Sequence, residues 1–487
     1  MMIELILLLP LIAAAISYFV KQQHVAEAVS MLSGVLQFIL ALLIAVDVMQ
    51  NGAIQYGLWY ADELSVFMLV IITFLGSMAV AYSFSYIGHD REEHEISGLQ
   101  LRRYYLLLQL FLFTMLVVVL TNNLGIMWIA IEGTTLTSAF LVGFYEKDTS
   151  LEAAWKYLII CSVGISMALF GVVLTYASSV DVAGFPSDSL NWTDLRSVAA
   201  LLDPTFLRIA FIFILIGYGT KVGFVPMHTW LPDAHSQAPS PISAMLSGVL
   251  LNCALYGILR FYIIMQLSVP GFAPDLLLIF GVISLVMAAA FIILAKDFKR
   301  LLAYSSIEHM GIIALGFGIG GFLGIFAGLL HMLNHALTKC LMFFGAGNIL
   351  QKYNTRSIAE VRGLAYIMPI TAALFLLGAL AITGSPPFSI FLSEVMVLQA
   401  GLGAGSYLVV AIYLFAILVI FAAFMYHVSK MLFGKPTEGV VRGEIHHVSL
   451  IPMAILLVSI LVIGLFLPQQ LMDFITKVAA LFPGGSR

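Results

Sequence analysis

The stretch FLRIAFIFILIGYGTKVGFVPMHTWLPDAH, residues Phe206–His235, decides how this chain folds. Its first part is apolar and long enough to cross a membrane, and Lys221 stands inside it. An ammonium group near the middle of a membrane helix costs about 2.5–3.5 kcal/mol on insertion scales. Pro226 follows shortly after, and because it lacks a backbone N–H it interrupts the helix. A charge beside a helix break at this depth is poorly explained by packing and indicates a path for ions.

The composition extends this interpretation to the whole chain. Of its 487 residues, 61% are hydrophobic and only 10% are charged, and the mean hydropathy is +1.05. These values are typical of a membrane protein and far from those of a soluble domain. The net charge of −4 includes no basic tract, so we expect a lipid bilayer and no nucleic acid as partner. We expect residues 3–20 to be a retained helix rather than a removed signal peptide.

The three cysteines predict nothing redox-active on this chain. Cys161, Cys253 and Cys340 all lie inside apolar segments and lack the spacing of metal ligands. We therefore expect no metal and no cofactor here, and any iron–sulfur or nickel centre must sit on a partner chain.

Apolar stretches long enough to cross about 30 Å of hydrocarbon recur along the chain and predict an all-α polytopic membrane protein of about fourteen transmembrane helices. The predicted spans lie near residues 3–20, 26–47, 59–87, 103–120, 123–144, 152–177, 205–234, 240–264, 273–295, 300–320, 322–349, 364–400, 405–433 and 448–468. Two are too long for one straight crossing, and each contains a break, at Pro226 in the first and at Pro386 and Pro387 in the second. The amphipathic tail 469–482 is predicted to lie on the surface.

The two broken spans are the seventh and the twelfth, which suggests an internal duplication. A repeat of five spans must be inverted relative to its copy, as in many ion-coupled carriers with discontinuous helices. We therefore expect four regions: residues 1–100 with helices 1–3, residues 101–265 as the first five-helix repeat, residues 266–435 as the second, inverted repeat, and residues 436–487 with helix 14 and a short tail.

The basic residues are distributed unequally between the two sets of connections that join the predicted spans. Those after odd-numbered spans carry Lys21, Arg91, Arg102, Arg103, Lys147, Lys296, Lys299, Arg300, Lys352, Arg356, Arg362, Lys430, Lys435 and Arg442. Those after even-numbered spans carry essentially Arg196. The positive-inside rule then places the first set in the cytoplasm and both termini outside. Lys156 and Arg260 lie nearer span ends, where snorkelling explains them.

Few ionisable residues remain inside the spans: Glu132, Lys221, His228, Glu308, His309, His331, His335, Lys339 and Glu394. A buried carboxylate alone takes up a proton and a buried lysine alone loses one, whereas together they keep each other charged. A proton moving past Glu132 and Lys221 would switch such a pair. The alternative is a structural buried ion pair.

The eleventh span carries His331, His335 and Lys339 at intervals of four residues, which places them along one face of a helix. Histidine titrates near neutral pH, so with intervening water this stripe suits proton hopping. The alternatives are histidines that merely hydrogen-bond between helices, or a metal site, for which no third ligand is evident.

Three positions near the breaks leave more than one interpretation. Glu308 and His309 either continue the proton path or bond to the broken helices. Glu394 follows the second break, where an exit residue toward the outside would be needed. His228 follows the first break and either controls access from the inside or caps freed backbone groups.

Four segments carry a family resemblance: GYGTKVGFVPMHTWLPDAHSQAPSPISAMLSGVLL, KRLLAYSSIEHMG, LLHMLNHALTKCLMFFGAGNI and GSPPFSIFLSEVMVL. Together they resemble the antiporter-like membrane subunits of complex I, multi-subunit cation/proton antiporters and membrane-bound group 4 hydrogenases, from about residue 100 to 435. The resemblance implies fourteen helices with two inverted five-helix repeats. It also implies that Glu132 and Lys221 match the family's glutamate–lysine pair, Lys339 its central lysine and Glu394 its terminal residue.

One position departs from many complex I relatives. Asn252, in SGVLLNCALYGILRF, stands where they carry a lysine that links the two halves. Asparagine binds water but holds no proton, so the link would pass through water or through Glu308 and His309. With IEHMG, this asparagine makes the chain most similar to component F of hydrogenase-4 and formate hydrogenlyase-type complexes. We also expect no long lateral helix of the kind in the largest complex I subunit.

The resemblance implies a proton-translocating subunit, with sodium coupling as a variant, of a membrane-bound hydrogenase-type complex in a prokaryotic cytoplasmic membrane. It implies other membrane subunits and a peripheral redox arm as partners, with iron–sulfur and NiFe centres there and no catalytic residue on this chain. The alternatives are an M- or N-type complex I subunit and a D-type subunit of a multi-subunit antiporter. A purely structural anchor is disfavoured because it has no use for so many costly buried charges.

Overall fold

The computed structural model describes residues 2–93, 96–180, 182 and 190–485, and nearly all of its regular structure is helical. The elements of the first half are α1 (Met2–Phe19), α2 (Gln23–Asn51), β1 (Ile54–Tyr56), β2 (Trp59–Ala61), α3 (Glu63–Glu92), α4 (Gly98–Leu120), α5 (Leu124–Val142), α6 (Asp148–Ala177), α7 (Trp192–Ser197), a 3₁₀ turn (Ala199–Leu201), α8 (Pro204–Val222), α9 (Trp230–Gln237), α10 (Ser240–Met245), a π-helical segment (Leu246–Leu250) and α11 (Leu251–Ser268). Those of the second half are α12 (Phe272–Ile293), α13 (Phe298–Ile319), α14 (Gly321–Tyr353), α15 (Leu364–Ile367), α16 (Pro369–Ile382), α17 (Ser389–Gly403), α18 (Tyr407–Leu432), α19 (Leu450–Phe466) and α20 (Gln469–Ala480).

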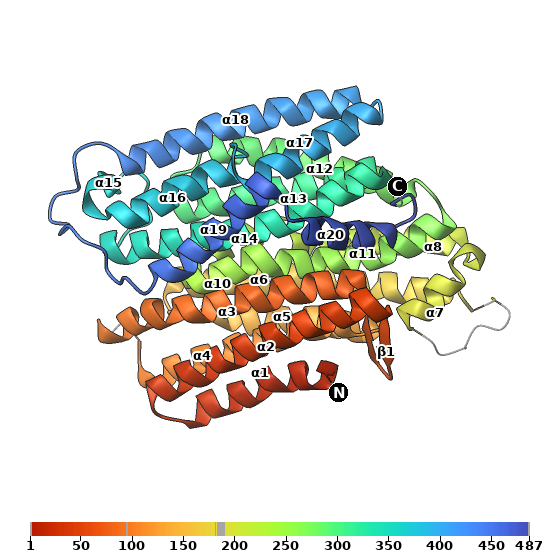
Figure 1. Cartoon of the computed structure of the whole chain (residues 1–487), viewed down its shortest axis with the longest axis horizontal. Coiled ribbons are helices and arrows are strands. Elements are labelled where there is room, and N and C mark those ends of the chain that lie inside the picture. The colour runs from red at the N-terminus through yellow and green to blue at the C-terminus, as the bar shows by residue number, and fades with distance from the viewer. Residues whose placement is uncertain (1, 94–95, 181, 183–189, 486–487) are drawn as a thin grey trace.

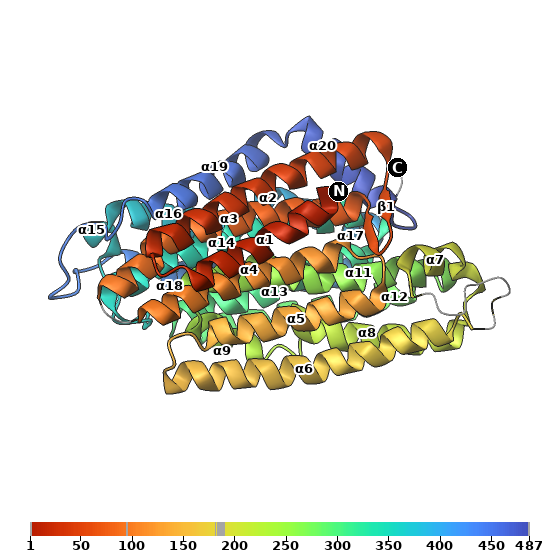
Figure 2. The ribbon, with the colours of Figure 1, turned by 90° about the horizontal axis from the view of Figure 1, so that it is seen from below.

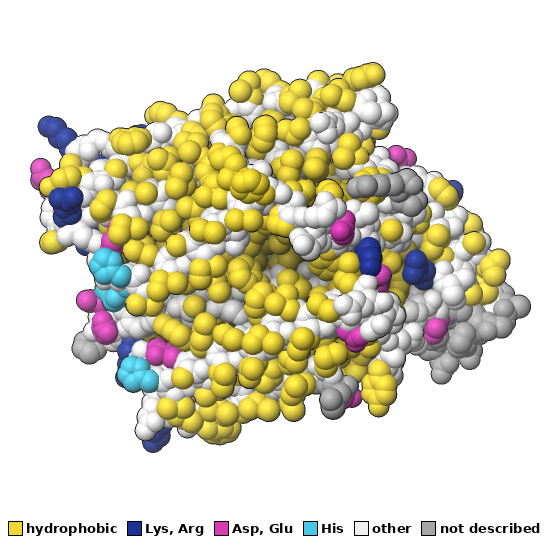
Figure 3. Space-filling view, viewed as in Figure 1, with side chains coloured by type: hydrophobic (Ala, Val, Ile, Leu, Met, Phe, Trp, Pro, Cys, Tyr) yellow, Lys and Arg dark blue, Asp and Glu magenta, His cyan; other side chains and the backbone are white. Residues whose placement is uncertain are grey.

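The long helices lie side by side along one direction and form a single elongated bundle (Figure 1). Hydrophobic side chains cover the middle of the face seen in Figure 3, with charged side chains gathered toward its two ends. We call the end that carries α15 the basic end, because the connections rich in lysine and arginine meet there. This distribution suits a bundle that spans a membrane along its long axis.

The span count agrees approximately with expectation. Within the described residues, twelve helices are long and apolar enough to cross a membrane, or thirteen if the bent pair α19–α20 counts as one span. The apolar helices α16 and α17 are shorter and are separated by the break at Pro386 and Pro387. This broken pair occupies the position of the predicted span 364–400.

Both predicted breaks lie between helices. Pro226 stands in the turn that separates α8 from α9, and Gly223 caps the end of α8 with a φ of +86°, which is left-handed and favours glycine. Gly384 begins the second break with a φ of +67°, and a side chain there would collide with the Glu394 carboxylate. The breaks therefore bring polar backbone and ionisable side chains together inside the bundle. The inverted repeats and region boundaries remain predictions.

Close packing along one edge sets the position of Lys221. Figure 2 shows α6 and α8 side by side at that edge. Glycines let the two helices approach, because a Cβ at Gly217 would meet the backbone of Ala168, and one at Gly164 would meet Thr220. The backbone next to Lys221 therefore lies directly against α6.

Several details differ from the sequence expectation. A short hairpin, β1–β2, precedes α3 where the predicted third span had already begun. Helix α20 turns by 82° from α19, and its apolar residues Ile475, Val478 and Ala479 are buried against the bundle. Only the polar side of the tail is thus at the surface, because its apolar side packs against the bundle.

Two basic residues have surroundings that differ from those predicted from the sequence. Arg260 does not snorkel: it is 3% exposed and forms a bidentate ion pair with Asp62, with both N–O distances 2.6 Å. Lys299 is not a loop lysine: it lies in the first turn of α13, is fully buried, and donates to the Ala238 carbonyl at 2.6 Å. Hydropathy alone missed both because the partners lie far away in sequence.

Candidate functional site

The first cluster of ionisable residues joins α5, α6 and α8. Lys221 is fully buried, and its Nζ donates to Thr135 Oγ1 at 2.6 Å and to the Tyr157 hydroxyl at 2.7 Å. Thr135 donates to Glu132 at 3.1 Å, and Ser162 donates to the other oxygen of that carboxylate at 2.8 Å. Glu132 and Lys221 are therefore connected through one hydroxyl rather than by direct contact. A hydroxyl both donates and accepts, so this bridge can pass a proton.

The second cluster surrounds α14. His309 from α13 hydrogen-bonds His331 through Nδ1 and Nε2 at 3.0 Å, and His331 hydrogen-bonds Ser393 of α17 at 2.9 Å. The ring of His309 also lies 5.3 Å from that of His335. All three imidazoles are fully buried, so a continuous file of rings connects α13, α14 and α17.

Lys339 lies further along α14 and is fully buried. Its Nζ donates to the Leu302 carbonyl at 2.8 Å and to Ser305 Oγ at 2.5 Å, both on α13. Neither ring nitrogen of the neighbouring His335 has a hydrogen-bond partner among the described residues. Buried polar groups of this kind are usually satisfied by ordered water. The stretch from His335 to Lys339 thus suits a short hydrated segment.

Two carboxylates meet beside this file. Ligand atoms of Glu308, His309 and Glu394 all lie within 4.8 Å of one another, and all three residues are buried. Carboxylates so close in an apolar setting share a proton or a cation. A groove of about 500 Å³ between α17 and α18, lined almost entirely by apolar residues, reaches Glu394.

Asn252 lies between the two clusters. Its amide donates to the Gly248 carbonyl at 3.0 Å and to the Met332 carbonyl of α14 at 3.3 Å, while its Oδ1 is buried without a partner among the described residues. The π-helical segment Leu246–Leu250 ends just before it, and such segments often mark functional positions. Within this segment Ser247 hydrogen-bonds Ser306 of α13 at 2.7 Å. The segment therefore ties the two halves together by polar contacts.

The remaining predicted residue, His228, lies in the first break. Its ring is 5.9 Å from that of Phe291, and its Nδ1 is buried without a hydrogen-bond partner among the described residues. The ring also has a backbone hydrogen bond with Pro226 in the break, so capping of a freed backbone group and control of access both remain open for His228. The structure brings Glu132 near Lys221, and Glu308, His309 and Glu394 near the α14 stripe, but it leaves His228 apart from both.

A polar cavity of about 840 Å³ opens at the basic end. Its lining includes Asp90, Tyr145, Gln237, Ala238 and Arg356. The Ala238 carbonyl, which accepts from Lys299, connects this cavity to the interior. Three residues before Ala238, the fully buried His235 lies near enough to Lys299 and Lys339 to interact electrostatically with both.

Sequence reasoning missed several members of this arrangement. Thr135, Tyr157 and His235 contact or adjoin predicted residues but were not predicted as site residues, and Lys299 was assigned to a connection. His235 carried a usable signal, since it is a histidine just after the first break. Hydroxyl side chains carry no such signal, because they are common in membrane helices at no great cost.

Comparison with known proteins now assigns the chain. The family described as "NADH:quinone oxidoreductase/Mrp antiporter, TM" matches residues 121–421, and "NADH-Ubiquinone oxidoreductase (complex I), chain 5 N-terminus" matches residues 51–95. The chain belongs to this family of antiporter-like membrane subunits. The matched region contains every predicted ionisable residue, from Glu132 to Glu394. This multi-pass antiporter-like subunit thus carries its charged interior in the part that defines the family.

Individual relatives are similar over most of their length. The antiporter-like subunit is 41% identical over 423 residues to a "Hydrogenase-4 component F homolog" of Methylacidiphilum infernorum, covering 86% of this chain and 88% of the relative. A chain of the archaeal membrane-bound sulfane sulfur reductase has a TM-score of 0.88 at 25% identity, with 99% and 98% covered. A chain of the Mrp complex from Dietzia sp. has a TM-score of 0.87 at 20% identity, with 99% and 97% covered, and shows the shared fold.

Proposed function

We propose that this antiporter-like subunit translocates protons within a membrane-bound hydrogenase-type redox complex. The observation that carries the proposal is the row of ionisable groups that runs from the half-buried Glu132 and the buried Lys221 through the α14 histidines to Lys339, Glu308 and Glu394, all of them buried. Removing so many charges from water is costly, and a role in ion movement explains why they are kept. The similarity to a hydrogenase-4 component F homolog supports the type of complex.

Protons enter, in this proposal, from the cytoplasm at the basic end. The 840 Å³ cavity brings water to the Ala238 carbonyl, behind which Lys299 is buried. From there His235 leads toward Lys339 and His335. Partner chains supply the redox chemistry and its iron–sulfur and NiFe centres, and their peripheral arm drives the charge movement.

The alternating protonation of Lys221 is the central step. When Lys221 holds its proton, its ammonium stabilises the Glu132 carboxylate through the hydrogen bonds of Thr135. When Glu132 takes up a proton, the ammonium loses the stabilising negative charge. A proton arriving at either residue of this pair thereby changes the stability of the charge on the other.

Inverted membrane vesicles that contain the assembled complex test the proposal. We expect Lys221→Ala to abolish acidification during turnover while the partner's redox activity in detergent remains, and Lys156→Ala, an exposed lysine on α6, to behave as wild type. Normal acidification by Lys221→Ala would refute the proposal. A requirement for Na⁺ in the wild type would instead assign sodium as the coupled ion, for which the Glu308–Glu394 pair is the candidate site.

A double-mutant cycle tests whether the pair is coupled. Glu132→Gln and Lys221→Met should together impair pumping no more than either alone, because each removes the same switch. Additive losses would show that the two residues act independently.

A further inference from the structure

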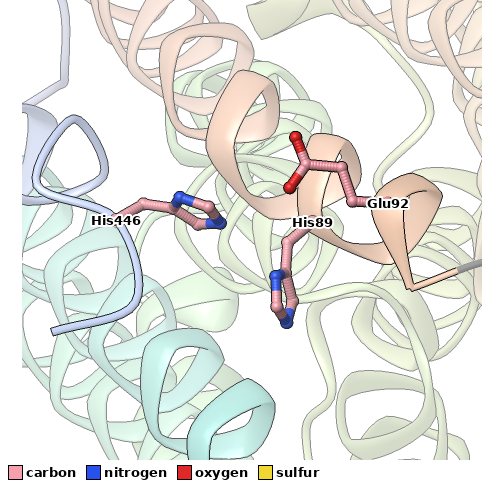
Figure 4. A group of neighbouring side chains, drawn as sticks. All are labelled: His89, Glu92 and His446. Atoms are coloured by element: carbon pink, nitrogen blue, oxygen red, sulfur yellow. The ribbon is translucent and has the colours of Figure 1, made fainter. Parts of the chain in front are cut away.

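A second group of potential ligands lies outside the proton path, at the basic end. His89 and Glu92 stand one turn apart at the end of α3, and His446 comes from the connection between α18 and α19. Figure 4 shows the Glu92 carboxylate directed toward the His446 ring, with the His89 ring close by. Their ligand atoms lie within 4.8 Å of one another, and the two imidazole rings meet edge to face at 5.3 Å.

The protein holds His446 in place from both sides. Two residues earlier, Glu444 accepts from the backbone N–H groups of Ile370 and Thr371 at 2.8 and 3.0 Å. Three residues later, Ser449 donates to the His446 carbonyl at 2.7 Å. An otherwise irregular connection thus presents this imidazole in a defined position.

The His446 ring nitrogen Nε2 is the least explained atom of the group. It is buried, yet it has no hydrogen-bond partner among the described residues. Buried polar atoms in native proteins are rarely left in this state, and an unassigned ion or water is a usual reason. A lone water would not account for the convergence of a second imidazole and a carboxylate.

We propose that His89, Glu92 and His446 form a binding site for a divalent transition-metal ion of the Zn²⁺ type. Two imidazoles and one carboxylate are a donor set that Zn²⁺ uses, with a fourth position left to water. Ligand atoms around a tetrahedral Zn²⁺ lie roughly 3.4 Å apart, so a shift of about an ångström closes the site. Glu92 is exposed and can make this shift.

The ion ties the α18–α19 connection to α3. The 840 Å³ cavity is lined by His89 and by Ile445, the residue that precedes His446, so the site lies at the rim of this cavity. Chelation there fixes the connection against the cavity wall. Metal binding at this rim does not depend on whether protons use the cavity.

Zn²⁺ binding to the full-length, untagged chain in detergent tests the site. After bound metal has been removed with a chelator, we expect wild type to bind one Zn²⁺ per chain in equilibrium dialysis. We expect His89→Gln and His446→Gln to bind this Zn²⁺ at least about tenfold more weakly. The neighbouring variants Glu93→Gln and His447→Gln should match wild type, since neither residue belongs to the group. Unchanged Zn²⁺ affinity in both histidine variants, or no binding by wild type at micromolar free Zn²⁺, would overturn the proposal.

Proteolysis gives a second readout that does not depend on counting ions. Arg442 is an exposed trypsin site four residues before His446. Zn²⁺ should slow cleavage at Arg442 in wild type and in His447→Gln but not in His446→Gln. Equal protection of all three proteins would contradict a site at His446.

Discussion

At the scale of single residues, Thr135 is the least conspicuous part of the first cluster and one of its most consequential. Its hydroxyl accepts from Lys221 and donates to Glu132, so it carries the connection between the two charges. Tyr157 supports the same ammonium by a second hydrogen bond and by its ring, whose centroid lies 4.9 Å from Nζ. The lysine therefore remains anchored when one partner changes its charge.

Thr135→Val should separate the two charges while leaving the helix intact. Hydrogen bonds to charged groups contribute about 1.5–3 kcal/mol, so we expect proton uptake into inverted vesicles to fall roughly tenfold or more. Thr137→Val is the matched control, because within the described part of the chain Thr137 hydrogen-bonds only to carbonyls of its own helix. Wild-type uptake by Thr135→Val would show that the charges communicate by another route.

Lys339 tests whether the second cluster relays protons or only supplies charge. Lys339→Arg keeps a positive charge that cannot be given up at working pH, so we expect it to be as inactive in proton uptake as Lys339→Ala. Lys352→Arg, at the end of the same helix, should leave uptake unchanged. An active Lys339→Arg variant would assign this position a fixed charge and no relay.

At the scale of elements, the start of α3 and the middle of α11 are joined by the buried Asp62–Arg260 pair. Arg260 also bonds Ser65 at 2.8 Å and Tyr256 at 2.9 Å and lies 4.3 Å from the ring of Trp192. The two terminal guanidinium nitrogens are directed at Asp62 and Ser65 near the start of α3, while Nε is directed at Tyr256 of the same helix α11. This pair therefore organises the end of the bundle opposite the basic end and stands apart from the proposed proton path.

Removal of one partner should destabilise the protein. Arg260→Met leaves Asp62 as an uncompensated buried charge, which costs about 3–5 kcal/mol, so thermal unfolding in detergent should shift to a clearly lower temperature. The double variant Asp62→Leu with Arg260→Met should recover much of this loss. A single variant with wild-type thermal stability would show that the pair contributes little.

At the scale of the whole molecule, the two clusters lie across the width of the bundle rather than along the membrane normal. The first cluster belongs to α5, α6 and α8, and the second to α13, α14 and α17, with Asn252 between them. In the proposed function, access from the basic end and transfer across the bundle are therefore separate steps. The direction of transport depends on which side the basic end faces.

Cysteine labelling can determine that orientation. The native cysteines are at most 1% exposed, so an introduced cysteine gives little background. By the positive-inside rule, a membrane-impermeant maleimide should label Thr205→Cys in intact cells and His24→Cys, at a side chain 96% exposed, only in inverted vesicles. The reverse pattern would invert the orientation and the proposed entry side.

The sequence by itself determined the helical membrane architecture, the two breaks and the ionisable interior residues. Hydrocarbon excludes charges and unpaired backbone groups, so each exception, from Lys221 to Pro387, can be recognised in the sequence alone. Only the tertiary structure decided the bridge through Thr135, the burial of Lys299, the Asp62–Arg260 pair and the meeting of His89 with His446. These contacts join residues far apart in the chain, and their partners are ordinary hydroxyls, carbonyls and end-of-helix side chains. Local composition does not encode which of them meet, because that depends on how the helices pack.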